Sequence, residues 1–272
     1  IRLGSTLSND QFANERFHYG LSNPPFGKKW EKDATAVNLE HNEKGYDGRF
    51  GPGLPRINDG SMLFLMHLAS KLELPKNGGG RAAIVLSGSP LFNGGASSGE
   101  SEIRRWLLEN DLVEAIVALP TEIFFRTGIG TYLWILSNKK DGRREKRVQL
   151  INGTGFWSSI KNEGNKRRII NDDQRSQIVD IYAAAENNEV SRMIDYRTFG
   201  YRRIKVLRPL RMSLVVDKAG LAKLQEEKAW LKLSPEHQEV WLAALQQHMD
   251  ATHLFGWAET FADETVRSAL PA

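Results

Sequence analysis

Two consecutive prolines, Pro24 and Pro25, restrict the fold of this chain more than any other feature of its sequence. They follow an apolar stretch, residues 17–22, that is typical of a β-strand. Proline fixes the backbone angle φ and carries no amide hydrogen, so neither residue can continue a hydrogen-bonded strand. The sequence therefore predicts a strand that ends in a rigid corner, Asn23-Pro24-Pro25-Phe26.

Helix and strand patterns alternate after this corner. A polar, glycine-rich loop is expected as far as about Gly60, and a sheet-covering helix over residues 61–74. Short buried strands are predicted at residues 81–86 and 112–119, with a helix at 102–110 between them. This order of strand, helix and strand predicts a parallel sheet.

Two further apolar runs, residues 131–136 and 148–151, flank a basic turn at 139–147. Their close spacing fits strands that are added antiparallel at the edge of the sheet. We interpret the basic turn as a solvent-exposed hairpin tip rather than a phosphate-binding loop. Beyond it, residues 172–187 have the pattern of a helix.

The whole chain is predicted to be an α/β protein: a doubly wound, Rossmann-like sheet, truncated at its N-terminus and followed by a helical C-terminal region. Residues 1–152 are assigned to the sheet domain, 153–211 to a connecting segment with a basic stretch, and 212–272 to the helical region. Helices are expected there at 217–232 and 235–250. Their apolar stripes suit either the core of a helical hairpin or a contact with another subunit.

Composition excludes several classes of protein. With 272 residues, 40% of them apolar and 26% charged, the chain is typical of globular proteins. The absence of cysteine excludes disulfides and thiolate zinc sites, and the six histidines lack metal-ligand spacing, so no metal is expected. No apolar run reaches the roughly 18 residues needed to cross a bilayer, and no export leader is visible, so a cytoplasmic protein without a membrane partner is expected. The net charge of +4 permits nucleic-acid binding without requiring it.

The residues of the corner suit the transfer of a methyl group to an amine on a nucleobase. Such an amine is a poor nucleophile, because its lone pair is delocalised into the ring. Two acceptors, the side-chain oxygen of Asn23 and the main-chain carbonyl of Pro24, would localise that pair on the nitrogen. Pro25 would keep the corner rigid, and Phe26 would stack on a base flipped out of the duplex. The alternative is a structural turn in which Phe26 fills the core.

Residues 17–27 resemble the target-base motif of amino-directed methyltransferases, and a chain of this length would contain the tetrapeptide pattern by chance on the order of 1% of the time. Other segments resemble N-6 adenine DNA methylases, in particular the modification subunits of type I restriction-modification systems. These segments are residues 80–86, 88–92, 99–104, 116–120 and 199–203.

The resemblance, which covers about residues 1–211, implies a methyltransferase sheet, S-adenosylmethionine as the methyl donor and adenine in double-stranded DNA as the substrate. It also implies assembly with a specificity subunit, a second modification subunit and a restriction subunit. Gly4, Ser5, Thr6 and Leu7 are similar to a cofactor-binding segment of the family. Ser5 stands where the family usually has an acidic residue that contacts the adenine of the donor.

The family's glycine-rich donor loop lies upstream of the target-base motif, and no residue precedes Ile1 in this sequence. The chain alone is therefore expected to be inactive. The strand at residues 17–22 is then expected to be an unpaired apolar edge, so the isolated chain should aggregate or self-pair.

A basic segment further along the chain is the candidate DNA contact. Tyr201, Arg202, Arg203 and Lys205 interleave aromatic and basic side chains, which suits a nucleic-acid backbone. The same pattern fits a covering strand with exposed charge equally well. Two other functions remain open: a non-catalytic DNA-binding or assembly remnant that never binds the donor, and an amine methyltransferase that acts on RNA or on protein glutamine.

Overall fold

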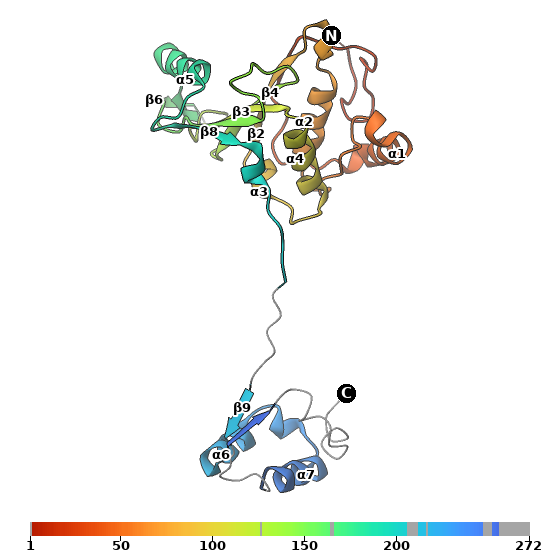
Figure 1. Ribbon diagram of the computed structural model, residues 1–272, viewed down its shortest axis with the longest axis vertical. Coiled ribbons are helices and arrows are strands. Elements are labelled where there is room, and N and C mark those ends of the chain that lie inside the picture. The colour runs from red at the N-terminus through yellow and green to blue at the C-terminus, as the bar shows by residue number, and fades with distance from the viewer. Residues whose placement is uncertain are drawn as a thin grey trace. The chain divides into compact units, whose positions relative to one another are not determined.

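The chain forms two compact units, Ile1–Arg203 and Ile204–Ala272. The first unit is built on a mixed six-stranded sheet with the order β1-β2-β4-β3-β5-β8. Figure 1 labels β2, β3, β4 and β8 of this sheet. The strands of this sheet are β1 (Tyr19–Ser22), β2 (Arg81–Ser87), β3 (Val113–Leu119), β4 (Thr131–Ser137), β5 (Arg147–Asn152) and β8 (Ser191–Asp195). The computed structural model describes residues 2–125, 127–163, 166–205, 212–215, 217–246 and 252–255.

The direction of the strands follows from the pairing in the sheet. β1 and β2 are parallel, and β3 runs in the same direction because both β2 and β3 are antiparallel to β4. β5 is parallel to β3, and β8 is antiparallel to β5 at the far edge. The carboxyl ends of β1, β2 and β3 therefore lie at one edge of the sheet, where open α/β sheets bind their ligands.

The expected antiparallel addition at the sheet edge is wrong. β4 is antiparallel, but it lies inside the sheet between β2 and β3, where Trp134 and Leu136 are buried. β5 pairs with β3 in parallel rather than with β4. β4 and β5 are close in sequence but are not neighbours in the sheet, so close spacing alone does not decide which strands pair.

Helices cover both faces of the sheet. α2 (Ser61–Ser70) and α4 (Gly99–Glu109) pack with Ile84 and Leu136 in the main core. α5 (Asp172–Ala184) packs in the smaller core around Val117 and Ile151. The sheet therefore has an apolar core on each side, as expected for an α/β fold.

One helix, α1 (Ala34–Lys44), lies in the region that was expected to be a loop, so that expectation is wrong. Val37 is the buried residue of α1, and the helix has no continuous apolar stripe. Its period therefore gives no signal in the sequence.

The remaining short elements of the first unit are α3 (Ser89–Phe92), the 3-10 turns η1 (Glu31–Asp33), η2 (Gly45–Asp47), η3 (Pro75–Asn77) and η4 (Tyr196–Phe199), and the hairpin strands β6 (Ser158–Glu163) and β7 (Lys166–Ile169).

The second unit contains the expected helices together with a two-stranded ribbon. The region expected to be one helix at 217–232 is α6 (Lys218–Glu226) followed by the 3-10 turn η5 (Trp230–Lys232), because the chain becomes extended at Glu227. α7 (Pro235–Gln246) follows. β9 (Met212–Val215) and β10 (Thr252–Phe255) pair antiparallel, which sequence reasoning did not anticipate. Across the residues described, none of the helices combines the length and the apolar character that crossing a membrane requires.

β1 forms one edge of the sheet, and its side chains are open to solvent. Tyr19 is 81% exposed and Leu21 is 89% exposed. Unpaired apolar edge strands favour pairing with another chain. Self-association of the chain therefore stays a prediction, which sedimentation velocity over a range of concentrations tests.

Candidate active site

The corner Asn23–Phe26 lies at the carboxyl end of β1, on the surface of the first unit. Asn23 and Pro25 are exposed, Pro24 is buried and Phe26 is half-buried. The following residue, Gly27, has a φ of 58°, a conformation that favours glycine. The buried proline fixes the corner to the body of the protein, while the Asn23 side chain remains free to meet a ligand.

Phe26 packs against the loop that follows β3. Its ring meets the ring of Phe124 edge-on, with 6.0 Å between the centroids and an interplanar angle of 68°. Aromatic rings prefer such edge-to-face contacts. Because β1 and β3 end at the same edge of the sheet, this contact joins two loops at the place where a ligand is expected.

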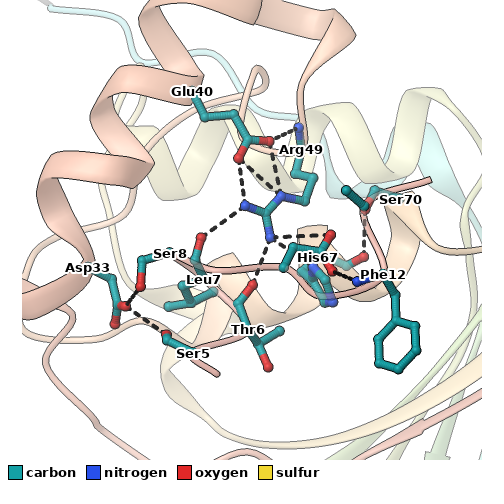
Figure 2. A network of polar contacts seen from close by, with 12 residues as sticks. Ser5, Thr6, Leu7, Ser8, Phe12, Asp33, Glu40, Arg49, His67 and Ser70 are labelled. Atoms are coloured by element: carbon teal, nitrogen blue, oxygen red, sulfur yellow. Dashed lines mark hydrogen bonds and ion pairs between the residues drawn. The ribbon is translucent and has the colours of Figure 1, made fainter. Parts of the chain in front are cut away.

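The segment Gly4–Leu7 is held by Arg49, a residue that the sequence did not single out. The guanidinium of Arg49 donates to the main-chain carbonyls of Thr6 at 2.8 Å and Leu7 at 2.9 Å (Figure 2). Arg49 also binds the Glu40 carboxylate on α1 through several hydrogen bonds, the shortest 2.6 Å. Since these contacts use only the main chain of the segment and Leu7 is buried, the side chains of Ser5 and Thr6 are left exposed.

A carboxylate, that of Asp33, lies beside Ser5. The hydroxyls of Ser5 and Ser8 donate to the same oxygen of Asp33, at 2.7 Å and 2.5 Å (Figure 2). Asp33 ends η1, the turn that follows the corner along the chain. The structure thus joins the candidate donor segment to the chain that leaves the candidate base-binding corner.

Further charges surround Arg49 and control the protonation of His67. Burial and the nearby Arg49 charge lower the pKa of His67 to about 4, so its ring is neutral at pH 7. Arg49 can only donate, so the Nδ1 atom of His67, 3.0 Å away, accepts this hydrogen bond. Burial alone would raise the pKa of Asp10, but its 2.6 Å ion pair with Lys71 lowers it below its usual value. Burial likewise opposes ionisation of Glu40, and the hydrogen bonds from Arg49 outweigh it and lower the pKa.

The candidate DNA-binding residues do not form a single cluster within one unit. Tyr201, Arg202 and Arg203 are exposed and follow η4 in the first unit. Lys205 lies beyond the boundary, in the second unit. Residues 206–211, which hold the remaining cations of this basic stretch, lie outside the described residues.

The basic turn at 139–147 is only partly a solvent-exposed tip. Arg143 is 67% exposed, as expected. The Lys140 side chain is 3% exposed and pairs with Asp111, and burial lowers its pKa. Arg144 is equally buried, and its guanidinium lies 3.4 Å from the Glu114 carboxylate. The solvent-exposed reading is therefore wrong for these two cations, which are part of the packing between strands.

A large cavity of about 1190 Å³ lies on one side of the sheet, beside α4 and η4. Ile116, Trp134 and Leu150 line it from the strands, and Tyr201 lines it from the segment after η4. None of the four corner residues lines this cavity. Within the described residues, no group of three or more histidine, aspartate or glutamate side chains is arranged to hold a metal ion.

An α/β sheet with helices on both faces and a rigid Asn-Pro-Pro-Phe corner at the carboxyl end of a parallel strand defines a class, the amino-methyltransferases. Residues 1–198 match a family model described as N-6 DNA Methylase. The chain belongs to the N-6 DNA methylase family, which confirms the resemblance seen in the sequence.

The chain is similar to methylase subunits of type I restriction enzymes. The MjaIX methylase subunit of Methanocaldococcus jannaschii is 27% identical over 202 residues, which are 70% of this chain and 32% of that protein. The EcoKI methylase subunit of Escherichia coli K12 is 31% identical over 131 residues, 48% of this chain and 21% of that protein. The chain therefore spans between a fifth and a third of the length of these relatives.

A solved structure supports the fold. The type I restriction-modification methyltransferase subunit from Streptococcus thermophilus superposes with a TM-score of 0.57 at 27% identity, covering 71% of this chain and 38% of that one. The expected α/β methyltransferase fold with a helical region is thereby confirmed. The roles of individual residues remain predictions.

Proposed function

We propose that the complete gene product methylates the exocyclic amine of adenine in double-stranded DNA, with S-adenosylmethionine as the donor. The observation that carries this proposal is the corner: an exposed Asn23 beside two prolines, at the carboxyl end of a strand in a protein of the N-6 DNA methylase family. Asn23, Pro24, Pro25 and Phe26 are the proposed catalytic residues.

The corner acts on the amine through hydrogen bonds. The Asn23 side-chain oxygen and the Pro24 carbonyl accept from the two N–H bonds, so the lone pair concentrates on the nitrogen. S-adenosylmethionine supplies an electrophilic methyl group on sulfur. When the nitrogen forms its bond to that carbon, the carbon–sulfur bond breaks and S-adenosylhomocysteine leaves. The excess proton passes to solvent, because an amide and a carbonyl are poor bases.

Gly4, Ser5, Thr6 and Leu7, with Asp33 beside them, are proposed to hold the adenine end of the donor. Its amine donates hydrogens, and the exposed Ser5 and Thr6 hydroxyls and the Asp33 carboxylate are acceptors. This set of acceptors fits the amine of the donor's adenine. Asp33 then takes the place of the acidic side chain that the family usually has at the position of Ser5.

Several wider assignments rest on the relatives, which are subunits of type I enzymes. We propose that the protein assembles with a specificity subunit, a second modification subunit and a restriction subunit, and that it acts in the cytoplasm, where genomic DNA lies. Tyr201, Arg202, Arg203 and Lys205 are proposed DNA contacts. We propose residues 1–152 as the main methyltransferase part and 212–272 as the subunit contact; the segment 153–211 between them is more than a connection, because it contributes α5 and β8 to the first unit.

The test is a methyl-transfer assay with the complete gene product and its specificity subunit. Labelled donor is offered with duplex DNA, with RNA and with protein, and the product nucleosides are separated. Label in N6-methyladenine from DNA is the expected result. Label only in RNA or in protein glutamine would contradict the proposal, and calorimetry that shows no donor binding at all would favour a non-catalytic remnant.

A further inference from the structure

The hairpin β6–β7 is fixed to the loop that follows β3. The main-chain amides of Arg167 and Arg168 both donate to the carbonyl of Glu122, at 3.0 Å and 3.2 Å. Arg168 also donates to the Thr121 hydroxyl at 3.0 Å, and its guanidinium stacks on Trp157 at 4.1 Å. Main-chain and side-chain bonds together therefore hold the hairpin against this loop.

The same loop forms the contact with the candidate base-binding corner. Phe124, two positions after Glu122, meets the ring of Phe26. The short segment 121–125 thus touches the hairpin with one part and the corner with another. Whatever binds at the corner lies close to β6–β7.

The hairpin β6–β7 is rich in basic residues. The sequence from Ser158 to Ile169 has four basic residues and one acidic residue. Among the side chains that the structure describes, the carboxylate of Glu122 lies 3.8 Å from both Arg167 and Arg168. The side chain of Arg167 is 61% exposed.

Aromatic surface lies next to these cations. The ammonium of Lys166 sits 4.9 Å from the centre of the Phe125 ring, and that ring is 61% exposed. Trp157, under Arg168, is 37% exposed. Basic groups interleaved with exposed rings are the composition that suits a nucleic-acid backbone and unstacked bases.

Resting on the proposed function, we infer that β6–β7 binds the phosphate backbone of the duplex DNA beside the flipped adenine. Lys166 and Arg167 make the phosphate contacts, and Arg168 holds the hairpin in place. A base leaves the stack only when its backbone is rotated, and cations next to the corner stabilise the phosphates in that position.

The experiment compares K166Q/R167Q with wild type in the complete gene product bound to its specificity subunit. The probe is a duplex oligonucleotide that carries a sequence methylated by the wild-type complex. Binding is measured from about 50 to 200 mM salt, and the slope of log affinity against log salt reports the number of phosphate contacts. R143Q is the matched control, because Arg143 is 67% exposed and lies 3.5 Å from Asp141, much as Arg167 lies beside Glu122.

The double variant is expected to lower the salt slope by about 2 and to raise the KM for DNA by about tenfold, while R143Q matches wild type. Circular dichroism and thermal unfolding establish that both variants fold. If K166Q/R167Q folds and its slope of log affinity against log salt is unchanged, while the wild-type complex methylates DNA, this inference is overturned and the proposed function stands. A wild-type complex that methylates only RNA or protein overturns the proposed function and this inference with it.

Discussion

The two parts of the candidate site are held in opposite ways. The corner is rigid because of its covalent structure: two prolines fix the backbone, and Pro24 is buried. The segment Gly4–Leu7 has no such restriction, and hydrogen bonds from Arg49 to its carbonyls fix it from outside. A corner of the first kind is visible in a sequence, whereas a support of the second kind appears only in three dimensions.

This difference predicts that substitutions at the corner change chemistry, and that substitutions around Arg49 change stability and donor binding. Asn23→Ala tests the first half and has the largest expected effect. It removes one acceptor for the amine and should raise the barrier by about 2 to 4 kcal/mol, with kcat reduced about 30- to 1000-fold. Single-turnover methylation by the complete gene product measures the barrier.

The affinity for the donor, measured by calorimetry, should remain nearly that of wild type in Asn23→Ala. Asn38→Ala on the exposed side of α1 is the control, because it removes a side chain of the same kind away from the corner. A large loss of donor binding in Asn23→Ala would falsify the assignment of the corner to the amine.

Arg49→Met tests the second half. The side chains of Arg49 and Glu40 are each 14% exposed, so the variant leaves a poorly solvated carboxylate without its partner. The free energy of unfolding should fall by about 2 to 3 kcal/mol. Because the variant also releases Thr6 and Leu7, donor binding should weaken about tenfold. Urea unfolding and donor titration measure the two effects.

Glu40→Gln combined with Arg49→Met removes both charges, and should recover part of the stability but none of the donor affinity. The recovery is expected because the unpaired carboxylate is gone. The donor affinity stays low because nothing holds the carbonyls of the segment. If Arg49→Met lost stability and kept full donor affinity, the segment would not be a donor site.

How far the sequence predicts this protein depends on whether the cause is local. The corner, the strands β2 and β3 and the helix α4 follow from proline chemistry and apolar runs. The place of β4 inside the sheet does not, because it depends on which strand returns between two parallel neighbours. α1 was missed because it lacks an apolar stripe.

The supporting residues of the site were hidden for the same reason. Arg49, Glu40 and His67 come from three separate segments, and their spacing in the sequence does not predict that their side chains form one hydrogen-bonded network. No sequence pattern predicts the contacts of Asp33 either, because its partners Ser5 and Ser8 are more than 20 positions away. Lys140 and Arg144 show the converse: a run of charges was read as solvent-exposed, although two of its members are buried.

The protonation of His67 makes the stability of the network around Arg49 sensitive to acid. This pH dependence distinguishes the network from the corner, whose four residues carry no titratable side chain. The folded pKa of about 4 lies below the usual 6.5, so the unfolded chain binds a proton that the folded chain rejects. Stability should therefore fall as the pH drops from 6.5 toward 4. Solvent reaches part of the ring, so about 1 to 2 kcal/mol is expected between pH 7 and pH 5.

His67→Gln keeps an acceptor for Arg49 and removes the titration, so its stability should depend less on pH in this window. The free energy of unfolding at pH 7, 6 and 5 measures the difference, and the exposed His237→Gln is the control. Asp10 and Glu40, whose pKa values are lowered, contribute a loss at more acidic pH, below their usual values of 3.8 and 4.5. If the free energy of unfolding depended on pH equally in wild type and His67→Gln, titration of the His67 ring would not be the cause of the loss of stability.

The smallest expected effect belongs to Ser5, where the two parts of the site meet. Ser5→Ala removes one of two hydroxyls that donate to Asp33, and the Ser8 hydroxyl still holds the carboxylate. A single exposed hydrogen bond is worth about 0.5 to 1 kcal/mol, so donor affinity should fall only about two- to fivefold. Ser5→Asp instead puts a second carboxylate beside Asp33, and the repulsion should weaken binding more than alanine does, although the family usually has an acidic residue at this position. If Ser5→Asp bound the donor more tightly than wild type, Asp33 would not be the acidic group of this site.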